Sequence, residues 1–212
     1  GYGPTHSQSL EKILFGIDNI AVFAVTSVIN PENLISFIGA LDCSNILIES
    51  KVDYGATLFQ NSSLKALDIN IIGGPSGSAL LSPWCKDSDK DALIITYGLI
   101  GRMVADNFEE IFERSDLLFD VFILQQLNPI PIAHFENAAR NSGKVLIIEE
   151  SSANFGWGSE LAYQLSELLP NIKIKRIGAK PVPIPSTREL EGEILVDKVD
   201  IINALNNLKD LA

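Results

Sequence analysis

The chain has few cysteines and no long apolar run, and both shortages exclude classes of protein. Its two cysteines, Cys43 and Cys85, lie far apart and in no CxxC or Cys/His spacing. This argues against a disulfide framework and against a zinc site. No apolar run approaches the roughly 18 residues of a membrane-spanning helix, and the N-terminus lacks the pattern of a signal peptide. We therefore expect a soluble, unexported protein in a reducing compartment: the cytoplasm, or the mitochondrial matrix in a eukaryote.

Positive charge is also scarce. The 212 residues carry 16 Lys and Arg against 27 Asp and Glu, a net charge of -11. Such a chain repels phosphate backbones and anionic lipids, so we expect no nucleic acid and no membrane among its partners. A basic partner chain suits it better. Hydrophobic residues make up 46% of the chain and charged residues 20%, which is typical of a globular protein with one large or two small domains.

The first 52 residues predict a β-α-β unit preceded by a helix. A helix is expected over 7–16, with Leu10, Ile13 and Leu14 on one stripe and Glu11 and Lys12 facing outward. The expected elements that follow are a strand over 20–25, a helix starting at 30–33 and a strand over 45–49. One such unit has too little sheet to bury both of its faces, so residues 1–52 are expected to be part of a larger domain.

Residues 53–90 are mixed in character and are expected to form a linker with little core of its own. One strand is predicted near 68–72. The Gly/Ser stretch at 73–78 lacks the lysine of a phosphate-binding loop, so we interpret it as a crossing segment.

From residue 91 onward the pattern becomes regular. Strands are predicted over 92–97, 120–124, 144–149 and 172–177, and helices over 100–114, 132–142, 158–169 and 196–208. Strands that alternate with helices indicate a parallel sheet covered on both faces, so the fold class is α/β.

One histidine stands out near the N-terminus. His6 follows a Gly3-Pro4 bend and precedes the helix expected over 7–16. An imidazole in that place can exchange protons near neutral pH, or it can cap the helix or bind a loop carbonyl. The other histidine, His134, is expected to be a surface or partly packed residue of a helix.

Four motifs in a fixed order identify a resemblance. They are GPTHSQSLEK at 3–12, TYG at 96–98, an EE pair at 149–150 followed by FGWGSEL at 155–161, and VPIP at 182–185. Together they resemble the beta subunit of the thiamine-diphosphate-dependent 2-oxo acid dehydrogenases, over nearly the whole chain.

The resemblance implies three regions. They are a truncated pyrimidine-binding-domain remnant over 1–52, a linker over 53–90 and a transketolase C-terminal domain over 91–212, with a parallel-rich sheet and helices on both faces. The implied activity is oxidative decarboxylation of a 2-oxo acid with acyl transfer to lipoyl groups. His6 is the catalytic residue that the motif carries over, as an acid/base that delivers a proton to the departing sulfur of the lipoyl ring.

The resemblance also implies partners and a cofactor that this chain does not hold alone. Thiamine diphosphate and Mg²⁺ belong to the assembled enzyme, so we expect no cofactor-binding or metal-binding residue here. The implied partners are an alpha-type subunit, a second beta chain in a heterotetramer, and an acyltransferase core with its lipoyl domain. One departure concerns Ile123-Leu124-Gln125, where the family usually has Asp-Leu-Arg. We expect altered subunit contacts there.

Two alternatives stay open. The chain could be a non-catalytic dimerisation and docking module. It could also be a relative of transketolase or deoxyxylulose phosphate synthase, for which a phosphate-binding cluster would be needed among the basic residues at 173–188. Glu149 and Glu150 are adjacent on a strand and point to opposite faces, so they are expected to cap a helix or contact a subunit instead of sharing a substrate. Trp157 is either a subunit anchor or a core residue.

Overall fold

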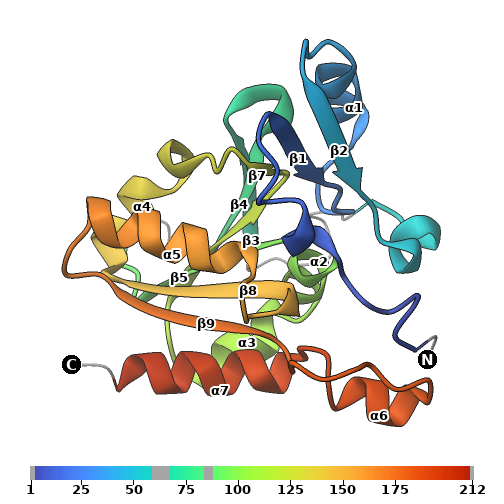
Figure 1. Ribbon diagram of the computed structural model, residues 1–212. Helices are drawn as coiled ribbons and strands as arrows, with labels where there is room; N and C mark the ends of the chain where they lie inside the picture. The colour runs from blue at the N-terminus through green and yellow to red at the C-terminus, as the bar shows by residue number, and fades with distance from the viewer. Residues whose placement is uncertain (1–2, 59–66, 84–87, 211–212) are drawn as a thin grey trace.

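The computed structural model describes residues 3–58, 67–83 and 88–210, and within them the strands form two sheets (Figure 1). The larger sheet has the order β3-β4-β6-β5-β8-β9. Its strands are β3 (Leu67–Ile72), β4 (Ser78–Pro83), β5 (Ala92–Tyr97), β6 (Phe119–Leu124), β8 (Lys144–Ser152) and β9 (Lys173–Ala179). The four strands from β6 to β9 in this order are parallel, which confirms the predicted α/β fold class.

Helices cover both faces of the larger sheet because its strands are apolar on both sides. Along β5, Leu93 and Ile95 belong to one core cluster and Ile94 to the other. The first cluster includes residues of α4 (Glu136–Ser142) and α5 (Trp157–Leu168). The second is covered by α2 (Gly98–Asp106), α3 (Phe108–Ser115) and α7 (Lys198–Lys209) (Figure 1).

The smaller sheet joins two distant parts of the chain. Strands β1 (Ile20–Ala24) and β2 (Ser44–Ile48) are parallel and are connected through α1 (Glu32–Gly39), which is the predicted β-α-β unit. The third strand, β7 (Gln126–Asn128), comes from the C-terminal half and pairs antiparallel with β1. Residues near the N-terminus and residues beyond 120 therefore build one sheet.

The segment expected to be a linker contributes to the core. Strands β3 and β4 form an antiparallel hairpin, and β4 pairs with β6 at the side of the larger sheet. Ala79 and Leu81 on β4 have no exposed surface. The expectation of little core over 53–90 is therefore wrong for the part that the structure describes, because a short apolar run follows the Gly/Ser stretch. A short 3₁₀ helix, η2 (Lys51–Gly55), precedes the hairpin and another, η4 (Gly74–Ser76), lies in its turn.

Two predicted helices are interrupted. The helix expected over 100–114 is divided into α2 and α3 at Asn107, whose side-chain amide donates to the Met103 carbonyl at 2.9 Å. The helix expected over 132–142 begins as the 3₁₀ helix η5 (Ile132–His134) and continues as α4. His134 is partly packed, as predicted, with Nδ1 2.9 Å from Ser78 Oγ. Burial lowers the pKa of His134.

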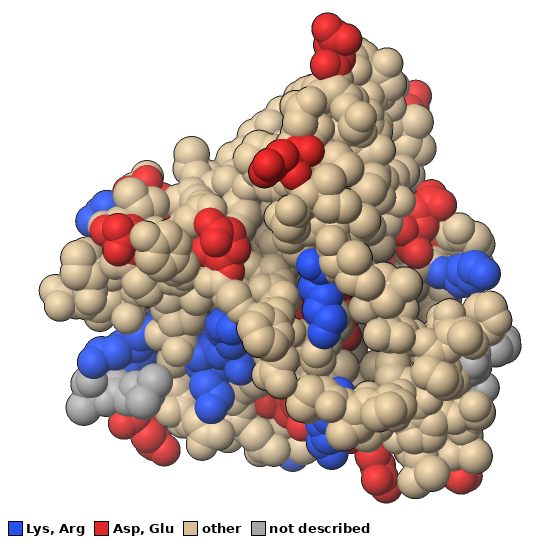
Figure 2. Space-filling view, in the orientation of Figure 1, with Lys and Arg blue, Asp and Glu red and all other residues tan. Residues whose placement is uncertain are grey.

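Basic side chains gather over β9 although the chain is acidic. Figure 2 shows them in the lower part of the view. β9 is an edge strand, and it carries Lys173, Lys175 and Arg176. Charged residues on an edge strand discourage pairing with another sheet edge. Among the described helices, none has the length and apolar character needed to cross a membrane.

Candidate functional site

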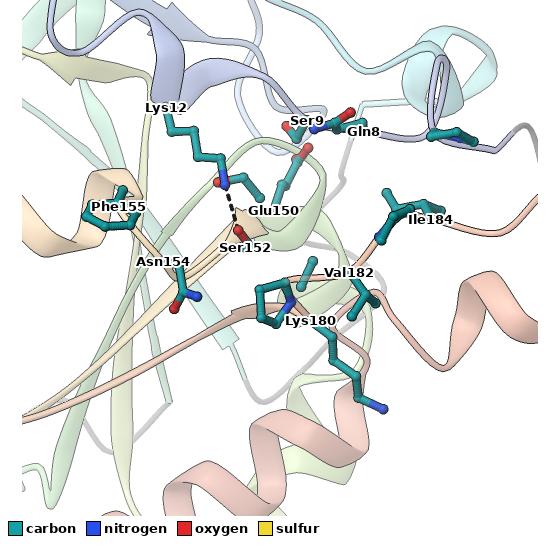
Figure 3. A pocket seen from close by; sticks show the side chains of 15 residues that line it. Gln8, Ser9, Lys12, Glu150, Ser152, Asn154, Phe155, Lys180, Val182 and Ile184 are labelled. Carbon is teal, nitrogen blue, oxygen red and sulfur yellow. Dashed lines mark hydrogen bonds between the residues drawn. The ribbon is translucent and has the colours of Figure 1, made fainter.

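A cavity of about 610 Å³ lies at the carboxyl ends of β8 and β9. Three segments line it: residues between 4 and 12, the end of β8 with the loop that follows it, and residues 179–184. Its polar wall includes Gln8, Ser152 and Asn154, and its apolar wall includes Phe155 and Val182 (Figure 3). Ligands of open α/β sheets bind at the carboxyl ends of the strands, so this cavity is the candidate site.

His6 lies in a tight turn beside this cavity. The carbonyl of Gly3 accepts hydrogen bonds from the backbone N–H of His6 at 3.3 Å and of Ser7 at 3.0 Å. Gly3 has a φ of 73°, which a glycine adopts without strain. Pro4 and Gln8 on either side of His6 line the cavity, whereas His6 itself is exposed and is not one of the lining residues.

The helix predicted after His6 is replaced by a single 3₁₀ turn, η1 (Glu11–Ile13). Its N-cap is Leu10, so the interpretation of His6 as a helix cap is wrong. The expected stripe is also wrong, because Leu10 and Ile13 are exposed and Glu11 is buried with 2% of its surface exposed. Leu14 does pack against the core. The segment contacts the larger sheet through the buried side chain of Glu11, and it has no continuous apolar stripe.

Glu11 accepts hydrogen bonds from two distant groups. Tyr97 Oη donates to Glu11 Oε1 at 2.5 Å, and the backbone N–H of Ser151 donates to the same oxygen at 3.2 Å. Burial and the neighbouring Glu11 carboxylate raise the pKa of Tyr97 well above its ordinary value, so the phenol remains a donor. The next residue, Lys12, donates from Nζ to Ser152 Oγ at 2.6 Å across the cavity (Figure 3).

The adjacent carboxyl groups at the end of β8 point apart, as expected. Glu150 Oε1 accepts from the backbone N–H of Leu99 at 2.6 Å, at the start of α2. Burial raises the pKa of Glu150 to about 7. Glu149 has no exposed surface, pairs with Arg176 at 2.7 Å and accepts from the backbone of Gly158 in α5. Both carboxylates therefore bind helix N-termini.

Trp157 is a core residue, so the core alternative was correct. It is 2% exposed, its indole N–H donates to the Leu127 carbonyl at 3.0 Å, and its ring packs edge-on against Tyr97 at 5.3 Å between centroids. These contacts fix the start of α5 beside the loop that carries Phe155. Phe155 is 94% exposed and has a φ of 56° at the cavity wall.

The side chains at the cavity do not fit a metal-diphosphate site. Glu149 is paired with Arg176 through Oε1 and has no exposed surface, and Glu150 accepts from the Leu99 N–H, so both carboxylates already bind groups of this chain. Among the described residues, no three His, Cys, Asp or Glu side chains are grouped so that they could hold a metal ion. Cys43 is exposed and free, and Cys85 lies outside the described residues.

The sequence patterns missed Glu11 and Tyr97 as a buried pair. One signal was present: Tyr97 ends an otherwise apolar strand, and a buried tyrosine hydroxyl usually has a hydrogen-bond partner. The identity of that partner, 86 residues away, is not encoded in a local pattern.

The sequence of this chain is similar to those of known proteins. The family described as "Transketolase, C-terminal domain" matches residues 85–201, more than half of the chain. Two similar proteins are pyruvate dehydrogenase E1 component subunits beta. The Porphyra purpurea protein is 23% identical over 211 residues, which are 97% of this chain and 60% of that protein. The mitochondrial protein of Dictyostelium discoideum is 23% identical over 207 residues, 95% of this chain and 55% of that protein.

A solved structure has the same fold. It is named "Split gene transketolase, inactive beta4 tetramer", and it superposes with a TM-score of 0.67 at 18% identity over 94% of this chain and 60% of that chain. The chain thus spans less than two thirds of the length of the relatives it matches. With the family match extending from β5 into α7, the chain belongs to the transketolase C-terminal domain family.

Proposed function

We propose that this chain is the C-terminal portion of the beta-type subunit of a thiamine-diphosphate-dependent 2-oxo acid dehydrogenase. In this proposal residues 1–52 are the end of the pyrimidine-binding domain, 53–90 connect it, and 91–212 are the transketolase C-terminal domain. The assembled enzyme decarboxylates a 2-oxo acid oxidatively and transfers the acyl group to a lipoyl group. Similarity to pyruvate dehydrogenase E1 beta subunits over 95–97% of the chain supports the subunit type.

His6 is the catalytic residue of this proposal. The observation that carries it is the exposed histidine in a tight turn whose flanking residues, Pro4 and Gln8, line the cavity. An imidazole can hold a proton near neutral pH and release it to a departing sulfur, which is the step that reductive acylation of a lipoyl dithiolane requires. Exposure leaves the ring accessible to a substrate carried on a flexible arm.

The cofactor belongs to other parts of the assembly. Thiamine diphosphate supplies the decarboxylation chemistry when it is bound, and Glu149 and Glu150 of this chain each bind another group of the chain. The proposed partners are therefore an alpha-type subunit, a second beta chain, and an acyltransferase core with its lipoyl domain.

The test is an assay of the polypeptide that contains this sequence, co-expressed with an alpha-type subunit. Wild type, His6→Ala and His134→Gln are compared in two reactions, 2-oxo acid decarboxylation with an artificial electron acceptor and acylation of a lipoyl domain. We expect His6→Ala to retain decarboxylation and to lose lipoyl acylation by about 100-fold or more, within the range for loss of a general acid. His134→Gln is the matched control, because His134 packs against Ser78 outside the cavity.

Two results would overturn the proposal. If the assembly turns over no 2-oxo acid but still dimerises and binds an acyltransferase core, the docking-module alternative stands. If it transfers two-carbon units between sugar phosphates, the transketolase alternative stands. Of the basic residues named for that alternative, Arg176 is paired with Glu149 and Lys173 lies exposed on the edge strand, while Lys180 lines the cavity.

A further inference from the structure

Glu11 is a buried carboxylate that the proposed chemistry does not use. Only 2% of its surface is exposed, although it lies on a single 3₁₀ turn between two exposed apolar residues, Leu10 and Ile13. A buried charge is costly unless hydrogen bonds compensate it. We therefore expect the hydrogen bonds of the Glu11 side chain to offset the cost of burying it.

Those hydrogen bonds form a continuous path to the larger sheet. The backbone N–H of Glu150 donates to Tyr97 Oη at 3.3 Å, Tyr97 Oη donates to Glu11 Oε1 at 2.5 Å, and the Ser151 N–H donates to the same oxygen at 3.2 Å. Tyr97 ends β5, and residues 150 and 151 are near the end of β8. One oxygen of Glu11 thus joins the turn to two neighbouring strands.

The other oxygen of Glu11 has no partner among the described residues. The carboxylate is therefore held on one side only, through Oε1, and its function in the fold depends on Tyr97 and Ser151. Lys12 adds a second connection to the same strand through Ser152. Consecutive residues of η1 therefore bind consecutive residues of β8, which fixes the register between them.

We propose that Glu11 is a positioning residue for His6. Its carboxylate holds the segment from Gly3 to Leu14 on the carboxyl edge of β5 and β8, and this contact places the His6 turn beside the cavity. The expected effect of Glu11 on catalysis rests on the proposed function. The expected effect of Glu11 on the position of the His6 turn does not.

Variants of Glu11 and Tyr97 separate their effect on the position of the His6 turn from a general loss of packing. Glu11→Ala removes the acceptor, Tyr97→Phe removes one donor, and Glu11→Gln keeps an oxygen that can accept from both donors. Matched controls are Glu109→Ala on α3 and Tyr163→Phe on α5, both at exposed positions.

The primary readouts need no activity. Hydrogen exchange followed by mass spectrometry reports on residues 3–17. These 212 residues contain two histidines, so their imidazole NMR resonances are those of His6 and of His134, which serves as an internal reference. We expect Glu11→Ala and Tyr97→Phe to increase exchange in 3–17 by about 10-fold or more and to shift the His6 resonances alone. Glu11→Gln should remain within about threefold of wild type.

The inference is overturned if exchange over 3–17 changes less than twofold in Tyr97→Phe, or if it rises equally in β5 and α7. In the assembled enzyme we expect Glu11→Ala to lower kcat for lipoyl acylation by about 10-fold with KM unchanged, and Glu11→Gln to restore it. If the enzyme turns over no 2-oxo acid while the exchange and NMR results hold, the proposed function fails and the positioning of His6 by Glu11 stands.

Discussion

Arg176 Nη2 lies 2.7 Å from Glu149 Oε1, so a cation of the edge strand pairs with a carboxylate that has no exposed surface. Burial raises the pKa of Glu149, and Arg176 together with the Gly158 N–H opposes that effect. The guanidinium also donates to the Ala153 carbonyl at 2.6 Å. The pair therefore connects β8, β9 and the loop after β8.

Arg176→Met should destabilise the protein by about 3–5 kcal/mol, because it leaves a buried carboxylate without its cation. The free energy of unfolding in urea measures this effect. Adding Glu149→Gln should recover at least half of the loss. Lys175→Met on the same strand is the control and should change stability by less than about 1 kcal/mol. Equal losses for the two single variants would show that the ion pair is not the cause.

Stability should depend on pH through Glu150, whose pKa is about 7 in the folded chain against an ordinary value of 4.5. Between these values the folded state binds a proton that the unfolded state has lost, so stability falls as pH rises from about 4.5 to 7. The effect is fully developed above the folded pKa and corresponds to about 3 kcal/mol.

The measurement for Glu150 is the difference in unfolding free energy between wild type and Glu150→Gln at pH 5, 6, 7 and 8. Glutamine keeps an acceptor for the Leu99 N–H and does not titrate. We expect wild type to lose stability relative to the variant as pH rises. Curves that run parallel across this range would contradict the prediction. Glu167→Gln, at an exposed position of α5, is the control.

Gly98→Ala should be more destabilising than Gly143→Ala, although both glycines have positive φ values of 55° and 64°. A Cβ at Gly98 would lie 2.5 Å from Glu150 Oε1, whereas a Cβ at Gly143 would meet open space. Both variants lose about 1 kcal/mol from the left-handed conformation. Gly98→Ala should lose about 1–2 kcal/mol more, because the Cβ would displace the carboxylate that caps α2. Thermal unfolding of the two variants side by side decides this, and equal losses would contradict it.

Leu81→Ala should cost about 2–5 kcal/mol, because Leu81 on β4 has no exposed surface and its loss leaves a cavity. The matched control is Ile71→Ala on the partner strand β3, where the side chain is 50% exposed and the expected cost is below about 1 kcal/mol. Urea denaturation provides the comparison. A small effect at Leu81 would support the view of 53–90 as a linker outside the core.

Periodic apolar runs predicted most of the fold. Short strands that pair with residues distant in the sequence were not predicted. The strands near 92–97 and 144–149 are apolar on both faces, so their type and their place in a parallel sheet followed from the sequence. β7 has only three residues, and β4 contains a short apolar run between Gly/Ser and Pro, so neither carries a periodic signal. Both strands form because neighbouring strands offer backbone partners, which local propensity does not describe.

The candidate site was predicted in part. The motif around His6 identified a turn, and the structure places its neighbours Pro4 and Gln8 at the cavity. The catalytic role of His6 stays a prediction. The position of Glu11 was predicted wrongly, because its amphipathic assignment assumed a helix and could not include a hydrogen bond to Tyr97 across 86 residues.

The pairing of β7 with β1 bears on how a gene of this family could be divided. The N–H of Ala24 donates to the Gln125 carbonyl at 2.8 Å, and the Asn128 side chain donates to the Ile20 carbonyl at 2.7 Å. A break in the coding sequence anywhere between these strands would place β1 on one polypeptide and β7 on the other, so neither product would contain the complete smaller sheet. Two such polypeptides would have to reassociate by fragment complementation instead of folding as independent modules.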